Sequence, residues 1–75
     1  MKTRITELLG IDYPILQGGM FCAATPELAA AVSNAGGMGI LSSAMYPELE
    51  EFRAALKETR ALTERPIGVN MSFLP

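Results

Sequence analysis

Neutral hydrogen-bonding side chains and glycines stand at three points where apolar runs of this sequence end. The runs end in Gln17-Gly18-Gly19, in Ser42-Ser43 and in Asn70-Met71-Ser72. Gln and Asn amides offer both donors and acceptors, and glycine lets a ligand approach the main chain closely. Together these groups suit the polar edge and flat face of an aromatic heterocycle.

The sequence offers little for nucleophilic, metal-dependent or acid–base catalysis. Cys22 is the only cysteine, and because the chain has no histidine, nothing in this segment activates its thiol. One cysteine, with acids confined to predicted helices, gives no cluster of metal ligands. No carboxylate ends an apolar run. We therefore assign no catalytic residue and no metal ligand to this chain.

Several of these residues also have ordinary structural interpretations. Gly18-Gly19-Met20 lacks the Gly-x-Gly-x-x-Gly spacing, and Gly36-Gly37-Met38-Gly39 precedes an apolar run instead of opening a helix, so neither indicates a nucleotide loop. Turn hydrogen bonding explains Ser42 and Ser43 as well as function does. For Gln17 and Asn70 function is favoured, because two amides at inward strand positions need partners.

The elements that must position these groups alternate between strand and helix. We expect strands over residues 13–18, 38–41 and 67–73, after a short helix over Thr3–Leu9 that Gly10 ends. Thr25-Pro26-Glu27 is typical of a helix start, and the expected buried stripe is Leu28, Ala31, Val32 and Ala35. A second helix is expected to begin at Pro47 and run for about 16 residues, with Leu49, Phe52, Ala55, Leu56, Thr59 and Leu62 on its inner face.

The third predicted strand carries the clearest information about architecture. Side chains alternate between its faces, so the large apolar set is Ile67, Val69, Met71 and Phe73, and the small and polar set is Gly68, Asn70 and Ser72. A doubly wound sheet would require apolar residues on both faces. One small, polar face instead favours a barrel strand whose inner end opens into a ligand site.

The fold class that we predict is α/β, as the N-terminal three β/α repeats of a TIM (β/α)8 barrel, truncated. Strand starts spaced about 25–30 residues apart indicate βαβ units and a parallel sheet. A complete barrel takes roughly 200 residues or more, against 75 here. We therefore expect this chain alone to be unstable, to self-associate, or to need the rest of the barrel.

Composition excludes several partners. The net charge is −2 with no basic block, which disfavours nucleic acid and anionic membrane surfaces. Apolar runs fall far short of the roughly 20 residues that span a bilayer, and the first residues lack the apolar region of a signal peptide. With a single cysteine, these features predict a cytoplasmic location.

The chain resembles the nitronate monooxygenase family, formerly called 2-nitropropane dioxygenase. The resemblance is carried by Thr3–Gly10, Tyr13–Met20, Thr25–Gly39 and Pro66–Asn70. It covers essentially the whole chain and is specific as a combination. Enoyl-acyl-carrier-protein reductase II and a branch of NAD(P)H:quinone reductases share the same motifs.

The resemblance implies that residues 1–75 are the N-terminal part of one FMN-binding TIM-barrel domain. By motif position it assigns flavin contacts to Gly19, Met20, Phe21, Asn70 and Ser72, with Gln17 and Gly18 as packing or supporting residues. The family's catalytic histidine and FMN phosphate site lie on later strands. Where relatives often carry Trp shortly after Met20, this chain has Phe21-Cys22-Ala23, which leaves substrate preference open.

Three interpretations remain open on this resemblance, two enzyme activities and an inactive fragment. A nitronate monooxygenase uses FMN and oxygen to convert an alkyl nitronate into a carbonyl compound and nitrite. A reductase would instead pass hydride from NAD(P)H through FMN to an enoyl thioester or a quinone. The third possibility is a fragment that is inactive because it lacks the catalytic histidine and the phosphate site.

Overall fold

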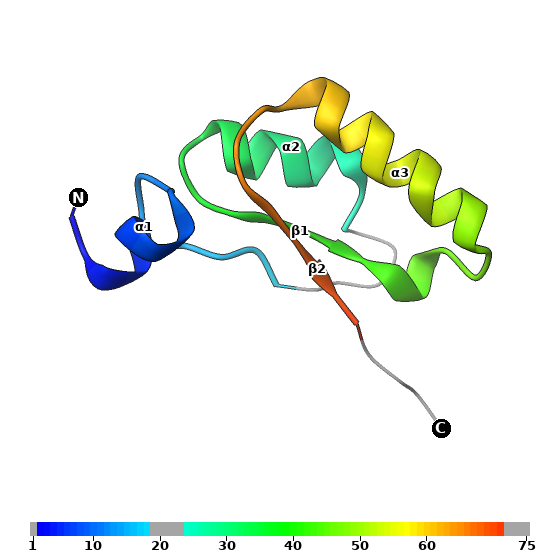
Figure 1. Ribbon diagram of the computed structural model, residues 1–75, viewed down its shortest axis with the longest axis horizontal. Helices are drawn as coiled ribbons and strands as arrows, with labels where there is room; N and C mark the ends of the chain where they lie inside the picture. Colours follow the sequence, from blue (N-terminus) through cyan, green and yellow to red (C-terminus); the bar gives the residue numbers. More distant parts are fainter. Residues whose placement is uncertain (1, 19–23, 72–75) are drawn as a thin grey trace.

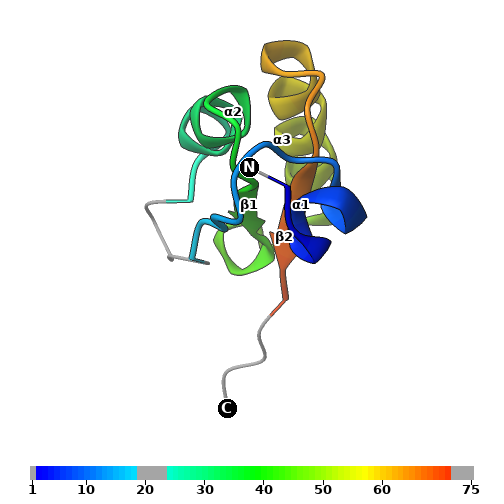
Figure 2. The same ribbon diagram turned by 90° about the vertical axis from the view of Figure 1, so that its left-hand side faces the viewer.

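The computed structural model describes residues 2–18 and 24–71. Its elements in chain order are α1 (Arg4–Leu9), α2 (Pro26–Asn34), β1 (Gly39–Ser42), the 3-10 helix η1 (Ser43–Met45), α3 (Leu49–Leu62) and β2 (Ile67–Asn70). Helices α2 and α3 lie side by side over one face of the two strands (Figure 1), and α1 stands apart from this layer. The end-on view in Figure 2 shows the helix layer on one side of the strand layer.

The strands pair in parallel, as expected for βαβ units. The register runs from Gly39 opposite Ile67 to Ser42 opposite Asn70. The strand predicted over residues 13–18 is reduced to one parallel bridge, between Leu16 and Met38. The main-chain N–H groups of Asp12 and Tyr13 both donate to the carbonyl of Gly36, at 2.8 and 3.0 Å. Since Pro14 has no N–H, little main chain is left for a longer ladder.

The predicted end of α1 and the predicted start of α2 are confirmed, and α1 begins at Arg4, one residue later than expected. Thr3 caps α1 through a capping box, and Gly10 ends it with a φ of 71°. Thr25 caps α2 by accepting a hydrogen bond from the N–H of Leu28 at 3.2 Å, and Pro26 opens the helix. These signals depend on neighbouring residues only, so the sequence carries them in full.

The predicted buried stripe of α2 is wrong. The residues that α2 buries are Pro26, Ala29, Ala30 and Ser33, whereas Leu28 is 37% exposed. The reason is the close approach of α2 to β1, where a Cβ placed on Gly39 would lie 1.9 Å from the carbonyl oxygen of Ala29. Only small side chains fit at such a contact, so alanines face the strand and the leucine turns outward.

Helix α3 begins later than predicted. Pro47 precedes the helix, and Glu48, in an extended conformation, is its N-cap. Ala55 and Thr59 are buried against the rest of the fold as expected, whereas Leu49 and Leu62 of the predicted inner face are 63% and 47% exposed.

One buried serine joins three elements at the amino-terminal end of the strands. Ser33 of α2 is fully buried, its hydroxyl donates to the carbonyl of Pro66 at 2.7 Å, and it accepts from the N–H of Gly39 at 2.9 Å. This joint fixes where β1 and β2 begin. The opposite, carboxyl-terminal ends of the strands are then left to form a site.

Candidate functional site

The candidate site is the inner face of the strands, on the side away from α2 and α3. A Cβ placed on Gly68 would lie 2.6 Å from Cδ1 of Ile40 and 3.5 Å from Sδ of Met38, which puts these three residues on one face. Because Gly39 contacts Ala29 of α2, the alternating residues Met38 and Ile40 must face the other way.

The inner face changes character along the strands. The part toward the amino-terminal ends of the strands is filled by Met38 and Ile40, whose side chains lie over Gly68. Its carboxyl-terminal part carries Ser42 and Asn70, which are partners in the parallel register. We call the set Gly18, Ser42 and Asn70 the rim. Small and polar groups therefore stand at the end of the strands where ligands bind in parallel barrels.

Two members of the rim are open toward a ligand. Within residues 2–18 and 24–71, the Asn70 side chain makes no hydrogen bond, and it is half-buried. A Cβ placed on Gly18 meets no atom of the described residues within 4 Å, and the φ of Gly18 is not positive. Neither packing nor backbone conformation in the described structure explains why position 18 lacks a side chain.

Of the predicted flavin contacts, Asn70 alone falls within the described residues. Its placement on the inner face agrees with the alternation read from the sequence, since its partner Ser42 shares that face. Gly19, Met20, Phe21 and Ser72 lie outside the described residues.

Gln17 does not join Asn70, contrary to the expectation that both amides point inward. Leu16 pairs with Met38, so Leu16 and Gly18 share the inner face and Gln17 turns toward the helix layer. There its Oε1 accepts a hydrogen bond from the N–H of Ile40 at 3.1 Å. The register of a single bridge decides this face, and the sequence alone does not show that register.

An apolar hollow borders the rim on the helix side, and sequence reasoning missed it. Its volume is about 440 Å³, and it is lined by Ser43, Tyr46, Pro47, Leu49, Phe52 and Met71. The rings of Tyr46 and Phe52 lie 5.8 Å apart between centroids. Burial raises the pKa of the Tyr46 hydroxyl, and the charges of Glu58 and Glu27 raise it further. The signal that could have found it is the Tyr46-Pro47 pair just after a strand end.

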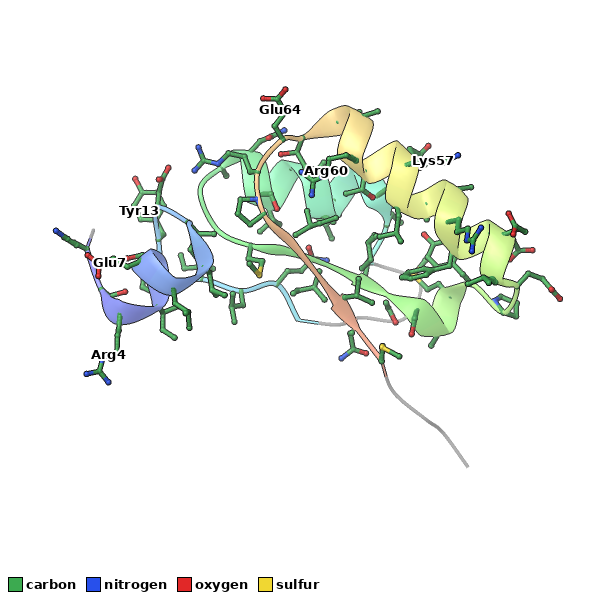
Figure 3. The ribbon with its side chains drawn as sticks, in the orientation of Figure 1. Arg4, Glu7, Tyr13, Lys57, Arg60 and Glu64 are labelled. Atoms are coloured by element: carbon green, nitrogen blue, oxygen red, sulfur yellow. The ribbon has the colours of Figure 1, made fainter. Side chains whose placement is uncertain are left out.

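Neither β1 nor β2 carries a charged side chain. Figure 3 shows Lys57 and Glu64 on the outer side of the helix layer, and Arg4 and Glu7 on α1. In the ranges that the structure covers, no three His, Cys, Asp or Glu side chains gather as metal ligands. None of the described helices is long and apolar enough to cross a membrane. The rim is thus a neutral surface suited to a neutral ring.

A sequence model described as nitronate monooxygenase matches residues 2–75, nearly the whole chain. The chain belongs to the nitronate monooxygenase family. This confirms the resemblance read from the motifs. Family members are oxidoreductases, and nitronate monooxygenases and FabK proteins are flavoproteins.

Curated relatives carry more than one activity. The chain is 50% identical over 71 residues to the nitronate monooxygenase of Pseudomonas aeruginosa, covering 95% of the chain and 20% of that protein. It is 47% identical over 73 residues to a (3aS,4S,5R,7aS)-5-hydroxy-7a-methyl-1-oxo-octahydro-1H-indene-4-carboxyl-CoA dehydrogenase of Rhodococcus jostii, covering 95% of the chain and 20% of that protein. The chain thus spans about one fifth of these relatives.

Solved structures show the same fold. The M276A mutant of FabK from Thermotoga maritima matches all of this chain and 25% of its own, with a TM-score of 0.89 and 51% identity. A nitroalkane oxidase from Streptomyces ansochromogenes matches 97% of this chain and 20% of its own, with a TM-score of 0.78 and 40% identity. The predicted fold class is confirmed in its coarser form, a mixed α/β segment that matches the N-terminal part of TIM-barrel enzymes.

Proposed function

We propose that residues 1–75 form part of the flavin-binding wall of an FMN-dependent oxidoreductase, a nitronate monooxygenase that oxidises alkyl nitronates with O2. The observation that carries the proposal is the neutral, open rim on a chain of this family. Gly18 leaves room for a ligand, and the Asn70 amide has no partner among the described residues. The proposed location is the cytoplasm.

The rim fits the chemistry of a flavin ring. Oxidised isoalloxazine presents carbonyl oxygens and ring nitrogens along one edge, and the amide of Asn70 supplies both a donor and an acceptor for such an edge. Gly18 allows the ring to approach the main chain without a side-chain clash. Gly19, Met20, Phe21 and Ser72 are proposed as further contacts. When bound, FMN supplies the two-electron redox chemistry.

This segment supplies binding and orientation, and it supplies no proton-transfer group. The chain has no histidine. Met38 and Ile40 lie over Gly68 on the inner face, where they would limit the access of water to a ring bound at the rim. We place the catalytic base and the phosphate site on later strands of the same domain, of which residues 1–75 are the N-terminal part.

A reductase that uses NAD(P)H is the second candidate. Identity is 51% to FabK and 50% to the Pseudomonas monooxygenase, so this segment is equally similar to both. The relative from Rhodococcus jostii is a dehydrogenase of a CoA thioester. If this protein is such a reductase, its substrate is an enoyl thioester or a quinone.

Anaerobic stopped-flow absorbance separates these activities. The holoenzyme that contains residues 1–75 is mixed with propyl-2-nitronate in one experiment and with NADH or NADPH in another. Rapid bleaching of the flavin band by the nitronate supports the monooxygenase, and rapid bleaching by a reduced nicotinamide supports the reductase. A flavin that neither compound reduces would contradict both, and a protein purified without FMN would contradict the cofactor proposal itself.

A further inference from the structure

The side chain of Gln17 continues the pairing of the first strand segment with β1. The main-chain N–H of Gln17 donates to the carbonyl of Met38 at 3.0 Å, and its side-chain Oε1 accepts from the N–H of Ile40 at 3.1 Å. In a longer parallel ladder a main-chain carbonyl would accept that second hydrogen bond. The amide oxygen therefore ties the tip of the segment to β1 beyond the point where main-chain pairing stops.

The nitrogen of the same amide is unexplained by this contact. Among residues 2–18 and 24–71, Nε2 of Gln17 is buried and has no hydrogen-bond partner. A buried donor without an acceptor is costly, and buried polar groups are nearly always paired. An acceptor oxygen alone would satisfy Ile40, and a glutamate would supply it. A glutamate would, however, place an unpaired charge there, whereas the amide stays neutral and leaves a buried N–H donor that needs an acceptor.

The position of Gln17 links this amide to the rim. Gln17 directly precedes Gly18, whose main chain stands at the open end of the inner face. Of the elements around it, β1 carries no charged side chain, and Glu27 of α2 is exposed. Asp12, earlier in the same segment, binds Arg65 at 2.6 Å. No described charge on these elements is buried beside the amide.

We propose that Gln17 is a positioning residue for the flavin site. Its oxygen holds the Gly18 main chain in place against β1 through Ile40. Its nitrogen, on the helix side of the strands, donates to an acceptor oxygen of the protein that comes into place when FMN binds on the inner face. Gln17 does not itself lie on the inner face with Asn70. This inference rests on the proposed function, because the loaded site is the FMN-bound one.

An amide-to-acid substitution tests the donor. In Gln17→Glu the buried carboxyl has no cation nearby, so its pKa should lie above the ordinary value of about 4.3. When protonated, it can accept from Ile40 and donate in place of Nε2; when ionised, it can only accept. We expect FMN affinity near that of the wild type at the acid end of a pH 5–9 series, and about tenfold weaker at the alkaline end.

Asn34→Asp is the matched control. It makes the same chemical change at the other end of the strands, where Nδ2 of Asn34 donates to the carbonyl of Leu62 at 3.1 Å. It should lower stability without making FMN affinity more pH-dependent than in the wild type. A Gln17→Glu protein whose FMN dissociation constant follows pH no more steeply than the Asn34→Asp protein would overturn the donor role.

Gln17→Met tests the contact with Ile40 independently of the cofactor. Methionine has a similar length but cannot accept strongly, so hydrogen exchange of the Ile40 N–H should accelerate at least about tenfold. Unchanged exchange at Ile40 would overturn the positioning role. If the wild-type protein holds no FMN, the proposed function and the donor role both fail, and the exchange rates still decide whether Gln17 holds the strand tip.

Discussion

Gly39→Ala should separate α2 from β1 and destabilise the fold severely. A Cβ at Gly39 would lie 1.9 Å from the carbonyl oxygen of Ala29, about 1.5 Å inside the 3.4 Å of an ordinary contact. The obstacle is helix backbone, which cannot rotate aside. Overpacking of a core costs about 1–3 kcal/mol and occasionally more, so we expect a loss of about 3 kcal/mol or more in the free energy of unfolding.

Gly18→Ala is the control for this prediction, because a Cβ there meets nothing within 4 Å and the backbone conformation is not left-handed. It should leave the free energy of unfolding unchanged or raise it by about 0.4–1 kcal/mol. Urea unfolding of the two variants of the complete protein without FMN measures both effects, because bound FMN would add its own affinity to the stability. Equal midpoints for Gly39→Ala and the wild type would refute the close helix–strand contact. Any loss of FMN affinity in a stable Gly18→Ala protein would report crowding at the rim.

Three further predictions concern stability and association. Ser33→Ala removes the partner of a buried N–H and of the Pro66 carbonyl, and should cost about 2–4 kcal/mol in urea unfolding; a loss under about 1 kcal/mol would contradict the joint. Burial raises the folded-state pKa of Tyr46, so the stability that the neutral Tyr46 hydroxyl contributes is complete below about pH 10 and is lost as the pH rises through the raised pKa. Tyr46→Phe keeps the ring against Phe52, so its free energy of unfolding should fall less steeply at alkaline pH than that of the wild type. Residues 1–75 alone expose Leu8, Ile15 and Met71 by 78%, 61% and 70%, so we expect association or a broad thermal transition, and a cooperative, monodisperse monomer in calorimetry and sedimentation would contradict this.

Local signals in the sequence predicted local structure well. The predicted helix end at Gly10 and the predicted cap at Thr25 follow from residues within three positions of the helix ends, and both are present. The inner position of Asn70 follows from strict alternation along β2. These features need no knowledge of distant contacts.

Features set by long-range contacts were mispredicted. The buried face of α2 depends on how closely Gly39 lets the helix approach, and this favoured Ala29 over Leu28. The first strand is cut short because the carbonyl of Gly36 takes two N–H groups from its start. Its single bridge also decides which way Gln17 faces. The residues of segment 13–18 alone predict neither the length of the first strand nor the direction of the Gln17 side chain.

A crystal structure of the holoenzyme with FMN bound tests the central claim most directly, through the distance between the Asn70 amide and the isoalloxazine ring. We expect a hydrogen bond of about 3 Å from this amide to the ring edge, with the ring over the inner face of β1 and β2. A flavin bound elsewhere, or an Asn70 side chain turned under α2 and α3, would contradict it.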